Sequence, residues 1–311
     1  MNIHNKYISL VLRIFVGLVF IASAILKYIS IDIFDLYVFE HNLFSISATE
    51  TLTRLLITAE LVLGFMLIFN LCARLAYYAA LIFLAGFTLY LFTLPYFFDV
   101  DITHCHCFGD AIVLNRTESI IKNILLLLCL AFVSPKFSIP KKWKTWVVIA
   151  LSIVTFAVVM IINAPNYLYT MVHKEKIQID FPMYESALQN SGMESEFTAG
   201  KQIICMYSVG CKFCKRAALK LHLILKNNQL PEDHVRAIFW AGTPDSLIHN
   251  FFSEQKIPVP EYTTFRVDTF LNITGGRMPV LLFSDDGNIV HKTNFITLNE
   301  KKVTEFFNND N

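Results

Sequence analysis

The chain has 311 residues, a length that allows about two domains. Hydrophobic residues make up 55% of it and charged residues only 16%, whereas soluble domains carry about 25% charged residues, so much of its apolar surface must lie in lipid. The net charge of +1 gives no basis for nucleic-acid binding, and seven cysteines are too few for a disulfide-stapled scaffold of this length.

Residues 1–165 hold almost all the long apolar runs and predict five membrane-spanning helices in a lipid bilayer. We expect the fourth, which is short, to extend back toward Thr117. The first is expected to be retained rather than cleaved as a signal peptide, because Arg13 interrupts the run and the run continues past Ala22-Ser23-Ala24. The predicted spans are Ile8–Ile29, Leu52–Phe69, Leu75–Leu94, Ile120–Val133 and Trp143–Ile162.

The basic residues predict the orientation of these spans. The connection between the fourth and fifth spans carries only basic charge, which is typical of a cytoplasmic loop, and Lys6 and Arg74 agree with this side. The other two connections are acidic. Five spans then place the C-terminal domain and the loop around Cys105 in an oxidising compartment, the periplasm bounded by a bacterial inner membrane. The basic residues of the connection are Lys136, Lys141, Lys142 and Lys144.

Ionisable residues inside the predicted spans are costly there and are often functional. Arg13, Phe20 and Lys27 recur every seven residues and therefore share one face of the first helix, while Glu60 lies near the middle of the second. A buried Glu60 either pairs with a cation such as Arg13 or stays protonated. The plainer interpretation is an internal ion pair that fixes helix packing. The functional one is a proton relay, or a contact from Glu60 and Arg13 to a quinone head group.

A short loop between the third and fourth spans contains Cys105-His106-Cys107. Two cysteines one residue apart form a strained disulfide that is easily reduced, which suits electron exchange better than a structural role. Alternating histidine and cysteine would also suit zinc or copper, and an inert loop is a third interpretation. We expect redox exchange and no metal. The metal alternative would use Asp101, His104, Cys105, His106 and Cys107.

These features together resemble the MauE branch of the DoxX-like four-helix membrane proteins, over roughly residues 7–135. The family pattern usually reads Cys-Gly-Cys-Phe-Gly, so His106 is a departure that keeps the cysteine spacing. The resemblance implies a link to methylamine utilisation, where the family is associated with disulfide formation in a periplasmic dehydrogenase subunit. It rests on Arg13…Gly17…Lys27, Ala59-Glu60…Gly64, Cys105-His106-Cys107-Phe108-Gly109 and Lys122-Asn123.

Residues 173–311 alternate polar and apolar positions as a globular domain does. The stretch 173–200 is expected to be a polar lead-in with no clear chemistry. Strands and helices alternate after it, and Asp285-Asp286-Gly287-Asn288 predicts a hairpin turn. The expected elements are a strand at 202–207, a helix opened by Cys211-Lys212-Phe213-Cys214, a strand at Val235–Trp240, a helix at Asp245–Gln255, strands at Tyr262–Val267, Leu281–Phe283 and Ile289–Lys292, and a helix at Leu298–Phe307.

This order of elements resembles a thioredoxin fold over about residues 195–308. Its two cysteines lie at a strand-to-helix junction, where free N–H groups and the helix dipole stabilise a thiolate. We therefore expect Cys211 to be the exposed nucleophile and Cys214, one turn into the helix, to be the buried resolving cysteine. The resemblance implies that Pro279 is cis and faces them. A zinc site would need a second cysteine pair, which this half of the chain lacks.

We predict an all-α membrane bundle, with four MauE/DoxX-like helices and a fifth transmembrane helix, followed by an α/β thioredoxin-like domain. The boundaries are 1–135 for the bundle, 136–172 for the basic loop, fifth helix and linker, and 173–311 for the periplasmic domain. The predicted enzyme takes electrons from exported cysteine-containing proteins through Cys211–Cys214 and Cys105–Cys107 to a quinone. Reverse flow, which would reduce or isomerise periplasmic disulfides, and a non-enzymatic maturation role stay open as alternatives.

Overall fold

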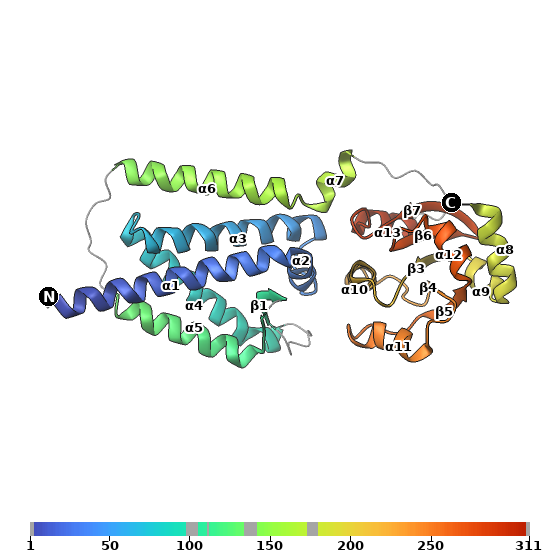
Figure 1. Ribbon diagram of the computed structural model, residues 1–311, viewed down its shortest axis with the longest axis horizontal. Helices are drawn as coiled ribbons and strands as arrows, with labels where there is room; N and C mark the ends of the chain where they lie inside the picture. The colour runs from blue at the N-terminus through green and yellow to red at the C-terminus, as the bar shows by residue number, and fades with distance from the viewer. Residues whose placement is uncertain (1–2, 98–104, 111, 134–141, 173–179, 309–311) are drawn as a thin grey trace. The chain divides into compact units, whose positions relative to one another are not determined.

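The computed structural model describes residues 3–97, 105–110, 112–133, 142–172 and 180–308. The chain divides into two compact units, residues 1–165 and 166–311 (Figure 1). The division falls where the long apolar runs of the sequence end.

The first unit is a helical bundle with a small two-stranded hairpin (Figure 1). Among the described residues, four helices are long and apolar enough to cross a membrane, and they lie in α1, α3, α4 and α6. The fourth predicted span is α5, which begins at Arg116 and packs against α1 and α4. Its 16 residues extend about 24 Å, less than the roughly 30 Å of a hydrocarbon core, which agrees with the prediction that the fourth span is short and extends back toward Thr117. The elements are α1 (Ile3–Ile29), α2 (Ile31–Phe39), α3 (Ile46–Ile68), α4 (Ala73–Phe97), β1 (Cys105–Asp110), β2 (Ile112–Leu114), α5 (Arg116–Ala131) and α6 (Lys142–Ile162).

Two glycines let α1 and α3 approach each other closely. A Cβ atom at Gly17 would lie 2.9 Å from the carbonyl oxygen of Gly64, and a Cβ at Gly64 would lie 2.8 Å from that of Gly17. A larger side chain at either position would force the helices apart, which is why small residues favour tight helix packing in membranes. The close contact brings Lys27 of α1 within reach of Glu60 of α3.

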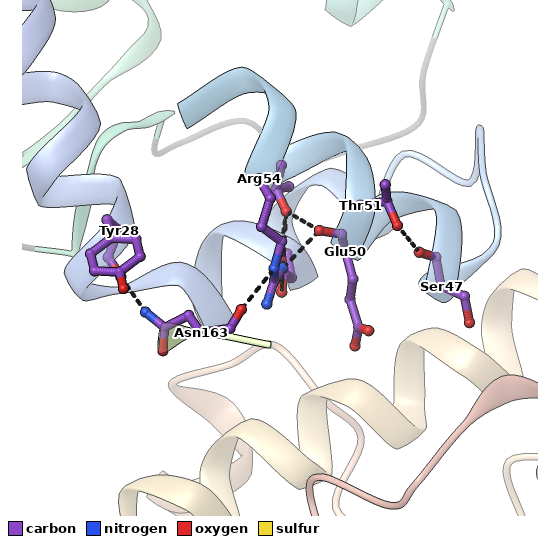
Figure 2. A network of polar contacts seen from close by, with 8 residues as sticks. Tyr28, Ser47, Glu50, Thr51, Arg54 and Asn163 are labelled. Carbon is purple, nitrogen blue, oxygen red and sulfur yellow. Dashed lines mark hydrogen bonds and ion pairs between the residues drawn. The ribbon is translucent and has the colours of Figure 1, made fainter. Parts of the chain in front are cut away.

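The two ends of the bundle are marked by contacts of α6. Near its first residue, the Nζ of Lys144 donates to the carbonyl oxygen of Asn70 in the α3–α4 connection, at 3.2 Å. Just after its last residue, the side-chain amide of Asn163 donates to the carbonyl oxygen of Tyr28 at the end of α1, at 3.4 Å (Figure 2). The basic start of α6 therefore lies with the α3–α4 connection, and its end lies with the end of α1.

The hairpin of β1 and β2 lies against the same end of α1. Gly109 in β1 has a φ of +60°, and a Cβ there would lie 2.5 Å from the carbonyl oxygen of Leu26 and 2.1 Å from the Oγ of Ser30. Only glycine fits this close approach. The strand that carries Cys105 and Cys107 therefore lies at the end of the bundle where α6 ends and the chain leaves the first unit.

The second unit is built on a five-stranded mixed sheet in the order β5-β4-β3-β6-β7. β3 pairs in parallel with β4 and antiparallel with β6, so it lies at the centre of the sheet. Side chains of β3 alternate between two buried faces. Ile204 and Met206 share a core with residues of α8, α9 and α12 on one face. The side chain of Tyr207, directly after β3, lies on the opposite face, where its ring packs on Phe251 of α11. The elements are α7 (Asn166–Val172), α8 (Phe181–Ser191), α9 (Glu194–Thr198), β3 (Lys201–Met206), α10 (Lys212–Asn227), β4 (Val235–Trp240), α11 (Asp245–Ser253), β5 (Glu261–Phe265), α12 (Val267–Thr274), β6 (Val280–Asp285), β7 (Asn288–Thr293) and α13 (Glu300–Asn308).

The strands and helices predicted for this unit are confirmed to within a few residues, and the fold is thioredoxin-like as expected. Two predictions are corrected. Within the stretch described as a polar lead-in, α8 and α9 bury Tyr184, Leu188 and Phe197 in the core. The strand predicted to run to Val267 ends at Phe265, and α12, which was not predicted, follows it.

Candidate redox site

The chain changes from strand to helix at Cys211-Lys212-Phe213-Cys214. Cys211 is the N-cap of α10, with an extended backbone (φ −86°, ψ 114°). The backbone N–H of Cys214 donates to the Sγ of Cys211 at 3.2 Å. The first N–H groups of a helix have no partner within the helix, so this contact satisfies one of them and directs a donor at the sulfur, where it stabilises negative charge.

The two cysteines differ in exposure. Cys211 is half-buried, Cys214 is fully buried, and both thiols are free. Burial raises the pKa of the Cys214 thiol, and its hydrogen bond with Cys211 raises that pKa further. The two sulfurs therefore have the exposures that an attacking and a resolving cysteine require, while the roles themselves stay predictions.

The loop before β6 lies beside Cys211. The Met278–Pro279 peptide bond is cis, which confirms the expectation for Pro279. The carbonyl oxygen of Met278 lies 4.0 Å from the Sγ of Cys211, and Pro279 is buried. The loop thus presents a main-chain carbonyl next to the reachable sulfur, at a place where a partner's extended backbone could pair with it.

An aromatic ring lies on the surface next to the cysteines. Phe213 is 50% exposed, and its ring packs against that of Phe295 with 5.9 Å between centroids. The guanidinium of Arg216 lies 5.5 Å from the Phe213 ring, and Lys212 is exposed. A partner protein would therefore meet an apolar face beside positive charge.

The thiol of Cys205 and the hydroxyl of Tyr207 lie buried at the end of β3, a few residues before the cysteine motif. Burial raises the pKa of the Cys205 thiol to about 12. The pKa of Tyr207 is raised well above its ordinary value by burial and by the nearby thiols of Cys205 and Cys214. Both groups stay neutral at physiological pH, so neither takes the proton from Cys214.

The raised pKa of Cys214 predicts a steep pH dependence for the resolving step. Only the thiolate attacks a disulfide, and below a raised pKa the thiolate fraction grows about tenfold for each pH unit. We expect Cys214 to resolve a glutathione mixed disulfide on Cys211 about tenfold faster per unit from pH 6 to 9. Rapid-quench mass spectrometry of the glutathionylated protein measures this rate. A plateau near pH 7 would contradict the assignment.

The other cysteine pair lies on β1 of the first unit. β1 and β2 are antiparallel, with Cys105 opposite Leu114 and Phe108 opposite Ile112. The side chains of Cys105, His106 and Cys107, and the whole of Asp101 and His104, lie outside the described residues. The redox and metal interpretations of this loop therefore stay predictions. Elsewhere, in the part of the chain that the structure describes, no three His, Cys, Asp or Glu side chains are grouped as metal ligands.

Glu60 is buried in the first unit and forms an ion pair with Lys27. Ser23 donates to the second carboxylate oxygen at 3.1 Å, and Lys27 also donates to the hydroxyl of Ser23 at 3.1 Å. The prediction that Glu60 pairs with a cation is confirmed, but the cation is not Arg13. Arg13 lies 14 residues before Lys27 on α1, a distance of about 21 Å along the helix, so the two predicted residues do not form one cluster.

A second buried cluster of charges was not predicted. Arg54 of α3 is 2% exposed and pairs with Asp35 of α2 at 2.6 Å. Figure 2 shows that its guanidinium also reaches main-chain oxygens, donating to Glu50 at 2.9 Å and to Asn163 at 3.3 Å. The sequence did contain a signal for this cluster, because Arg54 is a charged residue inside the apolar run of the second predicted span. The cluster ties the end of α6 to α2 and α3.

Comparison with known proteins agrees with the division of the chain into an N-terminal helical bundle and a C-terminal domain. Residues 5–135 match the family model of methylamine utilisation protein MauE. The chain is also similar to Protein TlpB of Flavobacterium psychrophilum, with 25% identity over 352 aligned positions that cover 96% of this chain and 94% of the relative. No solved structure matches the chain. Residues 5–135 are therefore a MauE-type membrane domain, and the chain continues into a C-terminal domain with a thioredoxin-like fold.

Proposed function

We propose that this chain is a membrane-bound thiol–disulfide oxidoreductase that forms disulfides in exported proteins and passes the electrons to a membrane quinone. The observation that carries the proposal is the pairing of a reachable Cys211 at a helix N-terminus with a buried Cys214 one turn later. This geometry lets a client thiol form a mixed disulfide with Cys211 while Cys214 leaves as a thiol, and the second thiol of the client then releases Cys211. The cysteine strand of the membrane domain supplies the next pair in the same chain.

The contacts within the first unit support a common side for the two pairs. The strand with Cys105 and Cys107 lies against the end of α1, and Asn163 contacts that same end. The chain therefore leaves the bundle on the side of the cysteine strand. Lys144 lies at the opposite end, and basic residues favour the cytoplasmic side. On this argument both pairs face the periplasm, across a bacterial inner membrane.

Each exchange in the proposed route balances. A client dithiol attacks the Cys211–Cys214 disulfide and becomes a disulfide, while Cys211 and Cys214 become thiols. These two thiols reduce the Cys105–Cys107 disulfide by the same exchange. The resulting dithiol then gives two electrons and two protons to a quinone, which becomes a quinol, and the Cys105–Cys107 disulfide is restored.

Cys107→Ser should leave Cys211–Cys214 reduced, because the pair then has no disulfide to pass its electrons to. Acid-quenched thiol trapping in native membranes with an oxidised quinone pool measures this, and we expect the oxidised fraction to fall by about tenfold or more. Cys72→Ser is the matched control, since Cys72 is a buried free cysteine directly before α4, and its replacement should leave both pairs unchanged.

Two results would overturn the proposal. If Cys211–Cys214 stays oxidised and keeps turning over in Cys107→Ser, its electrons do not pass through the bundle. If Cys211–Cys214 is reduced in the wild type whatever the state of the quinone pool, the protein works as a reductase or isomerase supplied from elsewhere.

A further inference from the structure

A small polar cavity lies inside the membrane domain. Its volume is about 30 Å³, and phenylalanine and other apolar side chains of α1, α4 and α5 form most of its wall. Five polar side chains line it as well, and they are Ser23, Lys27, Glu60, Lys122 and Asn123. Such a concentration of polar groups in the interior of an apolar bundle is costly unless each group is paired.

One of these groups finds no hydrogen-bond partner among the residues that the structure describes. Asn123 is 1% exposed, and both its amide nitrogen and its amide oxygen are buried without a hydrogen bond to any described residue. A buried amide of this kind is normally satisfied by an ordered water. One water needs roughly 10–15 Å³ of such space, so a cavity of about 30 Å³ holds about two.

The cavity connects two features of the domain. On one side Lys27 and Ser23 hold the Glu60 carboxylate, with Ser23 donating to it at 3.1 Å. On the other side the Nζ of Lys122 lies 4.5 Å from the centre of the Phe108 ring. Phe108 directly follows Cys107 on β1. The cavity thus lies between a buried carboxylate and the cysteine strand.

We propose that this cavity is a hydrated proton relay, in which waters held by Asn123 join the Glu60–Lys27 pair to the cysteine strand. The inference rests on the proposed function, because oxidation of the Cys105–Cys107 dithiol releases two protons with the two electrons that a quinone accepts. Each proton moves along the waters as one O–H bond breaks and the next forms, and it reaches the quinone oxygen with the electrons. Asn123 positions the waters, and Glu60 holds the proton in transit.

Asn123→Leu is the central test, because leucine has nearly the same size and removes both amide groups. The first measurement compares the melting temperatures of the full-length variant and the full-length wild type in detergent. A hydrated cavity makes the variant less stable, since leucine displaces the waters and leaves other polar groups unpaired. A dry cavity makes it more stable, since leucine removes two unpaired groups. The melting temperature thus tests hydration independently of any redox activity.

The second measurement is the rate at which reduced Cys105–Cys107 is reoxidised by a water-soluble ubiquinone analogue, in H₂O and in D₂O. We expect Asn123→Leu to slow this step on the order of 100-fold, because loss of the waters that Asn123 positions interrupts proton transfer. Asn123→Ser, which keeps a polar group and leaves room for water, should retain most of the rate. Thr88→Val is the matched control, because the Thr88 hydroxyl donates to the carbonyl oxygen of Leu84 within α4 and Thr88 does not line the cavity. If Asn123→Leu does not fold, the smaller Asn123→Val replaces it.

A lower melting temperature together with a slower rate and a changed solvent isotope effect supports the relay. A higher melting temperature in Asn123→Leu overturns it, because the cavity is then dry. An unchanged reoxidation rate also overturns it, even if the cavity is wet. If the wild-type pair does not react with the quinone at all, the proposed function fails and the relay fails with it, which separates that outcome from failure of the relay alone.

Discussion

Cys214→Ser should turn the protein into a trap for its client. Cys211 keeps its place at the N-cap of α10, and its thiolate still attacks a disulfide of an oxidised client and displaces one client thiol, which leaves a mixed disulfide. The buried sulfur of Cys214 that would reverse this step by displacing the client is absent. We expect turnover to fall on the order of 1,000-fold or more, as when a nucleophile of a catalytic unit is removed. Covalent complexes should accumulate at the same time. Non-reducing gels and mass spectrometry of membranes detect these complexes and identify the client.

Two variants control this experiment. Cys211→Ser removes the reachable sulfur and should give no complexes. Cys205→Ala changes a thiol that is fully buried in β3 and should form and release mixed disulfides as the wild type does. Complexes in Cys211→Ser, or none in Cys214→Ser, would mean that the roles of the two cysteines are wrongly assigned.

The cysteine site of the second unit was predictable because its signals are local. A buried strand, a turn and an amphipathic helix surround Cys211 and Cys214, so three neighbouring elements fix the position of the pair at the helix N-terminus. The cis bond at Pro279 came only from the resemblance to a fold, because no local pattern in the sequence requires it. The contact between Met278 and Cys211 joins residues 67 positions apart, which periodicity does not reveal.

Two of the helices in the second unit that were not predicted are short. α9 has 5 residues and α12 has 8, fewer than the window of about 11 that a helical period needs. α8 is longer, but its only buried residues are Tyr184 and Leu188, so its apolar face is easily taken for scattered surface residues. Their place in the core follows from the sheet that they cover rather than from their own sequence.

In the membrane domain the sequence indicated which face of α1 is polar but not the depth at which it meets α3. The heptad spacing placed Arg13 and Lys27 on one side of the helix, and either could have faced Glu60. The close contact of Gly17 with Gly64 sets the alignment of the two helices, and that alignment selects Lys27. Register between helices depends on such contacts, which a single sequence does not specify.

Arg54→Ala should destabilise the membrane domain strongly. Arg54 and Asp35 are both buried, and removing the guanidinium leaves the carboxylate without its cation, at a cost of about 3–5 kcal/mol. The variant also loses the hydrogen bond from Arg54 to the carbonyl oxygen of Asn163, which helps to hold the end of α6. Thermal unfolding of the purified protein in detergent measures this loss of stability. A spectroscopic probe attached to the first unit monitors the unfolding.

The double variant Arg54→Met, Asp35→Leu separates the ion pair from the rest of the cluster. Because it removes both charges, no carboxylate stays buried and unpaired, and most of the lost stability should return. If the double variant is as unstable as Arg54→Ala, the main role of Arg54 is its hold on Glu50 and Asn163 rather than its charge. Stability close to the wild type in Arg54→Ala itself would show that Asp35 takes up a proton instead of needing the arginine. In that case the Arg54 cluster is not needed to hold Asn163, and with it the end of α6, on the side of the bundle where the cysteine strand lies.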